Sequence, residues 1–99
     1  MTDGKGYPVA KVRAAESFGH ACNLGLAGGC DALTSFVRVG GIADLKDACD
    51  HDDGLACFLS GWIFSRGMGT SPDDRQAGPY IEKACTLGFG PACASIQHH

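Results

Sequence analysis

The amino-acid sequence predicts an all-α protein, a short helical solenoid in which disulfides join pairs of antiparallel helices. The cysteines form three pairs, and seven residues separate the partners of every pair. Residues around each pair recur at helical spacing, and no alternating run is long enough to propose a strand. A pattern repeated three times indicates an architecture rather than a single site, and such arrays usually bind other molecules rather than transform them. The pairs are Cys22 with Cys30, Cys49 with Cys57, and Cys85 with Cys93.

Length and composition restrict the classes of protein to which the chain can belong. The chain has 99 residues, so residues 1–99 form a single domain, and a hydrophobic content of 44% is that of a folded protein. The net charge of -3 and the lack of a basic run give a nucleic-acid partner little electrostatic support. The longest apolar stretch, 56–64, is too short to cross a bilayer, and residues 1–20 lack the apolar core of a secretory signal.

The six cysteines favour a disulfide framework. Such a framework in a short chain is typical of an oxidising compartment, and a periplasmic or secreted protein is the leading prediction. Zinc sites favour two to four residues between paired cysteines rather than seven, but a metal or free thiols remain alternatives. Each disulfide would close a small loop and stabilise the fold by about 2 to 3 kcal/mol.

The first predicted element is a helix over 8–22, followed by a shortened repeat over 26–51. We name the helix before the first cysteine of a pair a B helix and the helix after the second cysteine an A helix. Segment 8–25 is then the B helix of a partial repeat. The spacing between the first and second pairs is nine residues shorter than that between the second and third pairs. The shortened repeat has therefore lost its inter-helix loop, and its B helix, 42–50, should have only about two turns.

A full repeat over 52–87 comes next. Its A helix shows Cys57, Gly61 and Phe64 on one face, and Asp73 or Asp74 can cap the B helix that runs into Cys85. Proline disrupts a helix interior, so Gly78-Pro79 predicts either that this helix starts near Pro79 or that it bends. The last segment, 88–99, is the A helix of a partial repeat.

The turn inside each cysteine pair has a characteristic position three residues after the first cysteine. Gly25 and Gly88 occupy it in the first and third pairs, and glycine suits the backbone conformations of helix ends. Asp52 breaks this pattern in the second pair. Gly54, two residues later, is a candidate to take over the turn.

Segments 56–69 and 73–85 resemble a Sel1-like repeat. The paired cysteines make the chain similar to the cysteine-rich subgroup of that family. This subgroup includes the Helicobacter cysteine-rich proteins and a mitochondrial intermembrane-space assembly factor. The resemblance covers about residues 12–97. It departs at Ser60, where leucine is usual, and at Thr34, where glycine is usual. It implies a superhelix of paired helices related to tetratricopeptide repeats and used mainly for protein–protein contact. It also implies the mitochondrial intermembrane space as an alternative location.

A protein or peptide partner is predicted on the concave side of the solenoid, which the A helices are expected to line. The predicted contact residues lie opposite the face of Cys57, and an aromatic pair flanked by arginines is typical of an interaction hot spot. The alternative is that the aromatic rings pack against neighbouring helices and that the arginines are solvated. The candidate residues are Phe58, Trp62, Ser65 and Arg66, with Asp31, Ser35 and Arg38 at matching positions one repeat earlier.

Two other functions are alternatives to the interaction module. Some bacterial members of the Sel1-like family are credited with binding or hydrolysing penicillin-type compounds. In this sequence no serine lies in a nucleophile-elbow frame, and Ser60 is interpreted as a packing residue. The mitochondrial relative is linked to haem, and His20 and His51 would permit a haem or metal site only if the nearby thiols were free. We therefore expect no enzyme, no catalytic residue, no metal ligand and no cofactor.

The acidic turn after Cys49 holds Asp50, Asp52 and Asp53, which are interpreted as solvated turn residues. Self-association through the end helices is a further prediction, because solenoid ends without polar caps expose apolar faces.

Overall fold

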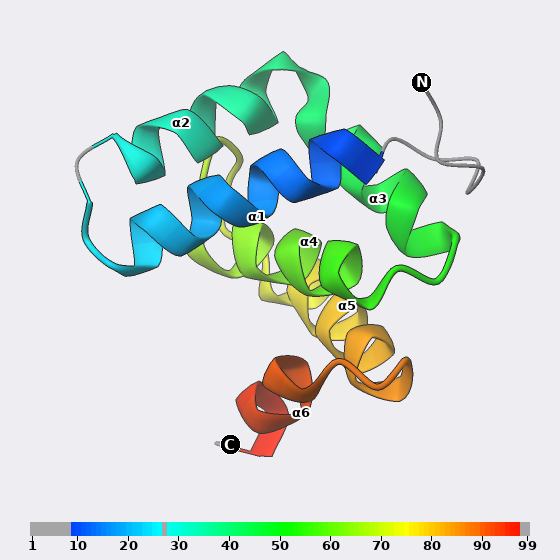
Figure 1. Cartoon of the computed structure of the whole chain (residues 1–99). Helices are drawn as coiled ribbons and strands as arrows, with labels where there is room; N and C mark the ends of the chain where they lie inside the picture. Colours follow the sequence, from blue (N-terminus) through cyan, green and yellow to red (C-terminus); the bar gives the residue numbers. More distant parts are fainter. Residues whose placement is uncertain (1–8, 27, 98–99) are drawn as a thin grey trace.

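The computed structural model describes residues 9–26 and 28–97, without the side chains of 95–97, and every regular element in this part of the chain is helical. The prediction of an all-α fold is thus confirmed for the described residues, whereas positions 8 and 98–99 of the predicted end helices lie outside them. Figure 1 shows α6 as a separate lower arm beneath the other helices. The elements are α1 (Val9–Asn23), α2 (Gly29–Phe36), η1 (Val37–Gly41), α3 (Ile42–Asp50), α4 (Gly54–Arg66), α5 (Asp74–Thr86) and α6 (Gly90–Gln97).

Three disulfides join the end of a B helix to the start of the next A helix, as the spacing predicted. The B helices α1, α3 and α5 each end one residue after the first cysteine of a pair, and α2, α4 and α6 begin before the second. The Cα atoms of the bonded cysteines are 4.4, 4.6 and 4.7 Å apart in chain order, which suits a disulfide. All six cysteines are bonded in this way.

Segment 26–51, which the sequence predicts to be a shortened repeat, has a kink in place of a loop. Helices α2, η1 and α3 follow one another directly, and the helical backbone is broken at Val39 and Gly40. Gly40 has φ 98 and ψ 4, a conformation that glycine adopts without a steric penalty. Helix α3 has 9 residues, so the prediction of a short second helix is confirmed.

The turn of the second pair does not use Gly54. Asp52 itself adopts a positive φ of 65, close to the values of 75 and 91 at Gly25 and Gly88. Gly54 is instead the first residue of α4, so the prediction that it takes over the turn is wrong. Aspartate tolerates this backbone conformation better than most residues do. The Asp53 carboxylate then starts α4 by accepting a hydrogen bond from the Ala56 N–H at 3.1 Å.

Helix α5 begins at Asp74, well before Pro79, so a late start at the proline is wrong. The Asp73 carboxylate accepts hydrogen bonds from the N–H groups of Arg75 and Gln76 at 3.0 and 3.2 Å, and the Gln76 side-chain amide donates to it at 2.9 Å. These bonds satisfy the free N–H groups of the first turn and hold it helical ahead of the proline.

The core runs through α1, α2, α3 and α4 and reaches α5 and α6 through small residues. Helices α4 and α5 approach closely at Gly61, where a Cβ atom would lie 2.5 Å from Ile81 Cγ1. Ser60 is fully buried and donates to the carbonyl of Ala56 at 2.9 Å, which fits its interpretation as a packing residue. The buried core side chains include Val12, Ala15, Leu33, Val37, Leu45, Ala48, Ala56, Leu59, Ile63, Ala84 and Ala92.

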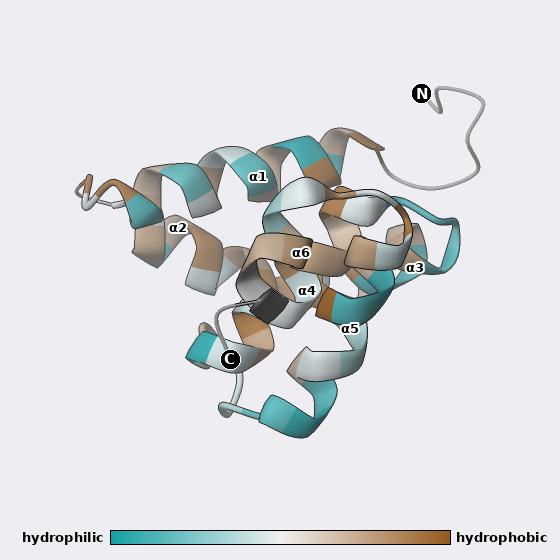
Figure 2. Ribbon diagram, turned by 90° about the horizontal axis from the view of Figure 1, so that it is seen from below, coloured by the Kyte–Doolittle hydropathy of each residue, from teal (hydrophilic) through white to brown (hydrophobic). Residues whose placement is uncertain are grey.

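In Figure 2, which is seen from below, α6 lies in front of α4, with hydrophobic segments on both helices. The placement of α6 leaves an opening between it and α1, and this opening is the candidate site.

Candidate functional site

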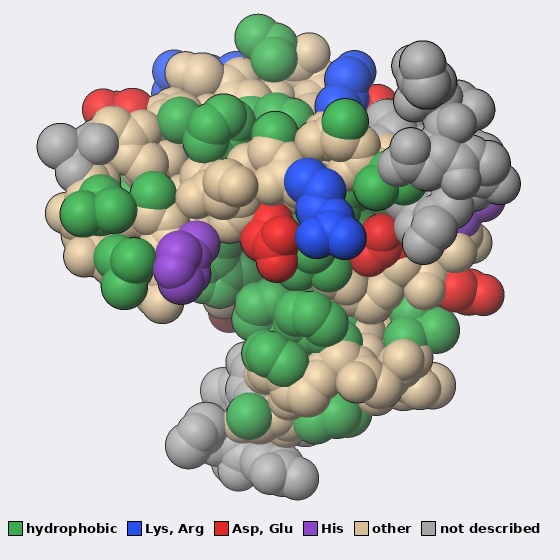
Figure 3. All heavy atoms as spheres, viewed as in Figure 1, with side chains coloured by type: hydrophobic (Ala, Val, Ile, Leu, Met, Phe, Trp, Pro, Cys, Tyr) green, Lys and Arg blue, Asp and Glu red, His purple; other side chains and the backbone are tan. Residues whose placement is uncertain are grey.

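A hollow of about 260 Å³ opens between α1, α4 and the turn that leads into α6. Helix α4 supplies an apolar floor, α1 supplies three polar side chains along one side, and the α5–α6 turn closes the other side. In Figure 3, hydrophobic side chains gather where the lower arm meets the body of the molecule. The residues that line the hollow are Glu16, Gly19, His20, Asn23, Leu55, Phe58, Leu59, Trp62, Phe89 and Pro91.

The floor follows from the helical spacing of α4. Leu55, Phe58, Leu59 and Trp62 stand at i, i+3, i+4 and i+7, so one face of the helix carries all four. Leu59 is buried, whereas Phe58 and Trp62 remain half-buried at the opening. The helix therefore presents two aromatic rings to the hollow instead of sealing them in the core.

Two neighbouring segments hold these rings in place. The ring of Phe58 lies 5.3 Å from the ring of Phe89, centroid to centroid, with the planes tilted by 38°. Across the hollow, a Cβ atom at Gly19 would lie 3.6 Å from the Trp62 ring, so the indole lies beside α1 with space for one further methyl group between them. Aromatic pairs of this kind contribute about 0.5–1.5 kcal/mol beyond the area that they bury.

The edge of the hollow beside Trp62 is cationic. The guanidinium of Arg66, the last residue of α4, lies 5.1 Å from the centroid of the Trp62 ring. A cation in this position is attracted by the electron-rich face of the indole. Arg66 thus places a positive charge beside the aromatic floor.

The opposite face of α4 carries a different aromatic contact. Phe64 stacks on Tyr80 of α5 at 5.9 Å with an interplanar angle of 9°. Burial, and after it the negative charge of Asp50, raises the pKa of Tyr80 above its usual value. The phenol therefore stays neutral at physiological pH, and this pair joins α4 to α5 without facing the hollow.

The structure brings together only some of the residues predicted to bind a partner. Phe58 and Trp62 line the hollow, and Arg66 contacts Trp62 at its edge. Ser65 is exposed and lies outside the lining. The remaining three, Asp31 and Ser35 on α2 and Arg38 on η1, are exposed and likewise do not line the hollow.

Sequence spacing did not identify the contributions of α1 and of the last turn. The polar side chains of α1 stand at i, i+4 and i+7, namely Glu16, His20 and Asn23. This spacing places them on one face of the helix, but it does not show which helix that face meets. Phe89 lies four residues after Cys85, where the turn projects it toward Phe58. The equivalent position in the second pair is Asp53, so the repeat pattern gave no sign of an aromatic ring there.

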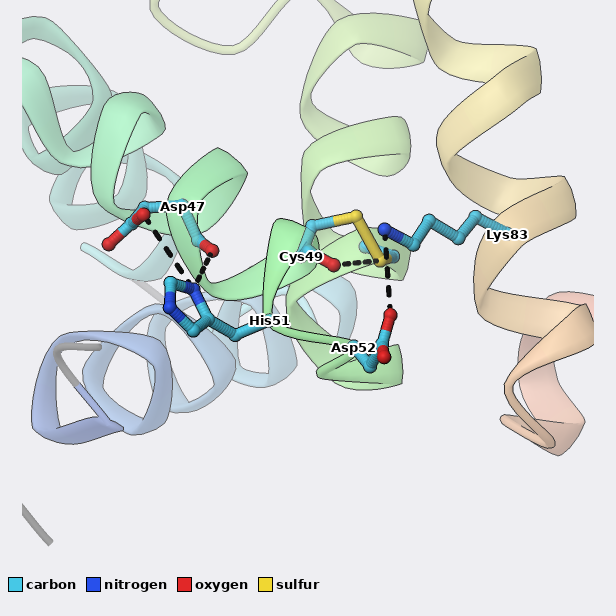
Figure 4. A network of polar contacts seen from close by, with 6 residues as sticks. Asp47, Cys49, His51, Asp52 and Lys83 are labelled. Atoms are coloured by element: carbon cyan, nitrogen blue, oxygen red, sulfur yellow. Dashed lines mark hydrogen bonds and ion pairs between the residues drawn. A yellow bond between two sulfur atoms is a disulfide. The ribbon is translucent and has the colours of Figure 1, made fainter. Parts of the chain in front are cut away.

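A separate polar cluster surrounds the second disulfide, as Figure 4 shows. His51 Nδ1 lies 2.8 Å from the carbonyl of Asp47, and Lys83 of α5 forms an ion pair with Asp52 at 3.8 Å. Cys57 Sγ lies 3.6 Å from the carbonyl oxygen of Cys49. Lys83 thus meets the α3–α4 turn at the surface, and the Asp52 side chain is 72% exposed, as expected of a solvated turn residue. Within the described residues, no group of three or more His, Cys, Asp or Glu side chains is arranged to hold a metal ion.

Comparisons of the chain with protein-family models, with curated proteins and with solved structures find no match. The resemblance to Sel1-like repeats therefore stays a prediction that rests on residues 56–69 and 73–85. The three disulfides fit an oxidising compartment. None of the described helices is both long and apolar enough to span a membrane.

Proposed function

We propose that the chain is a protein-interaction module that receives an apolar side chain of a peptide partner in the hollow between α1, α4 and the α5–α6 turn. The observation that carries this proposal is the half-buried state of Phe58 and Trp62 at the open end of an apolar floor. Tryptophan and other aromatic residues in such positions dominate the binding energy of protein interfaces, because a partner completes their desolvation.

The size of the hollow suits a single side chain of a partner. Small-molecule sites usually enclose about 300–1,000 Å³, and this hollow has about 260 Å³. One aromatic or large aliphatic side chain fits a space of that size. Glu16, His20 and Asn23 along α1 supply hydrogen-bonding groups for the peptide backbone on either side of the anchor.

The surrounding architecture supports an interaction module of the Sel1-like type, folded as a short solenoid. Three B–A helix pairs, each closed by a disulfide of the same sequence separation, follow one another along the chain. We place the module in the periplasm or outside the cell, with the mitochondrial intermembrane space as the alternative, since disulfides persist in such compartments.

Two observations favour the interaction module over the alternative functions. A haem or metal site at His20 or His51 needs thiolates, but the six cysteines are bonded to one another. Hydrolysis of a penicillin-type compound needs an activated nucleophile, whereas Ser60 is buried and its hydroxyl donates to a helix carbonyl.

Selection of linear peptides from a phage-displayed library on the oxidised protein tests the proposal. We expect the enriched peptides to share an aromatic or aliphatic anchor. Calorimetric titration of one enriched peptide should show that Trp62→Ala weakens binding by about 30-fold, which corresponds to about 2 kcal/mol for a hot-spot residue. Phe58→Ala should also weaken binding.

The matched control is Val39→Ala, because Val39 is 84% exposed at the kink and does not line the hollow. It should leave the affinity unchanged. Circular dichroism of each variant checks that the helices persist. Enriched peptides that bind Trp62→Ala as tightly as the unaltered protein would contradict the proposal.

A further inference from the structure

Helix α6 is the most weakly held wall of the hollow. It packs mainly against α5, whereas α1 packs against α2, α3 and α4. Helix α6 has 8 residues, and Ala92 is the one fully buried side chain among those of its residues that are described. An isolated helix of fewer than about 12 residues is only marginally stable in water. The position of α6 therefore depends on its covalent and local links to the end of α5.

Those links concentrate at the α5–α6 turn, which supplies Phe89 to the hollow directly before Pro91 of α6. The backbone N–H of Phe89 donates to the carbonyl of Ala84 at 2.9 Å, and the disulfide between Cys85 and Cys93 closes the turn. Phe89 lies between the bonded cysteines and packs on Phe58. The same disulfide thus holds both α6 and one side of the site.

The three disulfides differ in their accessibility to a reductant. Cys49 and Cys57 are 1% and 0% exposed, so a thiolate cannot reach their sulfur atoms in the folded protein. Cys85 and Cys93 are both partly exposed, and in the first pair Cys22 is partly exposed and Cys30 exposed. Reduction of a disulfide requires attack on one of its sulfur atoms. The two outer disulfides are therefore open to reduction in the folded protein, whereas the buried central one is not.

The consequences of reducing the two outer disulfides also differ. Opening Cys22–Cys30 leaves α1 packed on three helices, and Gly29 still brings α2 against the end of α1, where a Cβ atom would lie 2.6 Å from the Cys22 nitrogen. Opening Cys85–Cys93 leaves α6 with its packing on α5, the buried Ala92, the backbone hydrogen bond of Phe89 and the ring of Phe89, but with no second or third helix to hold it as α1 has. Reduction of Cys22–Cys30 should therefore have little effect on the hollow, whereas reduction of Cys85–Cys93 should change it.

We propose that the Cys85–Cys93 disulfide is a redox-sensitive latch: its reduction releases α6 and opens the hollow, and its re-formation restores the site. The effect on partner binding rests on the proposed function, whereas the opening of the hollow does not.

The chemistry needs an external dithiol or two monothiols. One thiolate attacks a sulfur of the Cys85–Cys93 bond, which forms a mixed disulfide and releases the other cysteine as a thiolate that takes up a proton. A second thiol then displaces the protein sulfur. The protein gains two thiols, and the reductant leaves as its disulfide. Re-formation is the reverse exchange: an external disulfide takes the two electrons from the Cys85 and Cys93 thiols and leaves as two thiols.

Trp62, the single tryptophan of the chain, is a built-in probe of the hollow. The oxidised protein is exposed to increasing dithiothreitol, and each sample is divided in two. One part is alkylated and mapped by mass spectrometry to identify the opened disulfide. In the other part, acrylamide quenching of Trp62 fluorescence measures how far the indole is exposed.

The latch predicts that Cys85 and Cys93 become alkylated at dithiothreitol concentrations that leave Cys49–Cys57 bonded. Over the same range, quenching of Trp62 should rise, and it should fall again on re-oxidation. Cys85→Ser/Cys93→Ser should show the raised quenching without reductant. The matched control Cys22→Ser/Cys30→Ser removes a disulfide of the same sequence separation and should keep the quenching of the oxidised protein.

Two results would overturn the latch. One is unchanged quenching in the folded Cys85→Ser/Cys93→Ser variant; the other is opening of Cys85–Cys93 only together with Cys49–Cys57. If that variant loses its helical circular dichroism, graded reduction of the unaltered protein decides alone. Absence of any peptide that binds the oxidised protein would reject the proposed function but not the latch, since Trp62 quenching needs no partner.

Discussion

Gly61 and Gly19 both lie where two helices meet, but only one of the two contacts is too close for a larger residue. A Cβ atom at Gly61 would lie 2.5 Å from Ile81 Cγ1 and 3.0 Å from the carbonyl oxygen of Ala77. At Gly19 the nearest atoms, on Leu59 and Trp62, would be 3.6 Å away, which is an ordinary contact. Gly61 is thus required for the approach of α5 to α4, whereas Gly19 leaves space at the hollow.

Alanine at these positions should change the free energy of unfolding in opposite directions. Gly61→Ala should destabilise the protein by about 1–3 kcal/mol, because the added methyl group pushes α5 away. Gly19→Ala should stabilise it by about 0.5–1 kcal/mol, because alanine restricts the unfolded chain and fits the helix. Urea unfolding followed by circular dichroism measures both values. Equal stability of the two variants would contradict the close packing of α4 and α5.

At this scale, helical spacing could place Phe58 and Trp62 on one face of α4 but could not determine what that face meets. The candidate positions on α2 and η1, such as Asp31, were chosen by analogy between repeats, and they lie outside the hollow. A kink at Gly40 stands in place of a loop between α2 and α3, so the contacts of segment 26–51 need not match those of segment 52–87. The opposing wall comes from α1, through packing that spacing alone does not specify.

Helix α5 shows how a capping residue determines where an element begins. The hydrogen bond from the Gln76 side chain, followed by that from the Gln76 backbone N–H, holds the pKa of the Asp73 carboxyl below its usual 3.8. A carboxyl whose pKa is lower in the folded state stabilises the fold above its unfolded pKa. That contribution is lost as the pH falls through the lower folded pKa.

Asp73→Asn should therefore weaken the acid dependence of the thermal midpoint. The asparagine oxygen still caps α5, but it does not titrate. From about pH 6 to about pH 3, the midpoint of the variant should fall less than that of the unaltered protein. Thermal unfolding followed by circular dichroism at each pH makes the comparison. An identical fall in both proteins would show that the charge of Asp73 has no part in the cap.

Among the elements, the sequence was informative wherever one local interaction dominates. The cysteine spacing located the helix ends, and the missing loop at Gly40 predicted the short α3 correctly. Two expectations differ from the structure: α5 does not start late at Pro79, because Asp73 caps a first turn ahead of it, and Asp52 rather than a glycine has the positive φ of the second turn. Propensities give the cost of each conformation, but not which neighbouring hydrogen bond offsets it.

At the scale of the whole molecule, three cross-links of equal size connect the helices. Each disulfide joins residues with a sequence separation of 8, so each restricts the unfolded chain to the same extent. Differences in their contribution to stability must therefore arise in the folded state, where the central pair is buried and the outer pairs are partly exposed.

Removal of each pair by alanine should reveal this difference in the free energy of unfolding. Cys22→Ala/Cys30→Ala should cost about 2–3 kcal/mol through the loss of the cross-link. Cys49→Ala/Cys57→Ala should cost more, because it also leaves unfilled space in the core. Urea unfolding of both variants measures the costs. A smaller loss for the central pair would contradict its place in the core.

Two exposed leucines lie on the surface outside the hollow. Leu24 and Leu26, at the turn between α1 and α2, are 59% and 58% exposed and do not line the hollow. Self-association through the ends of the molecule stays a prediction, and a contact at these leucines would leave the hollow available to a peptide.

The most direct test of the central claim, that a partner binds in the hollow, is a nuclear magnetic resonance titration of the oxidised, isotope-labelled protein with an enriched peptide. The account predicts that the largest shift changes fall on the indole N–H of Trp62 and on the amides of Gly19, His20, Phe58 and Phe89. It also predicts that the amides of Asp31, Ser35 and Val39 stay nearly unchanged. Shift changes centred on α2 and η1, with Trp62 unaffected, would contradict it.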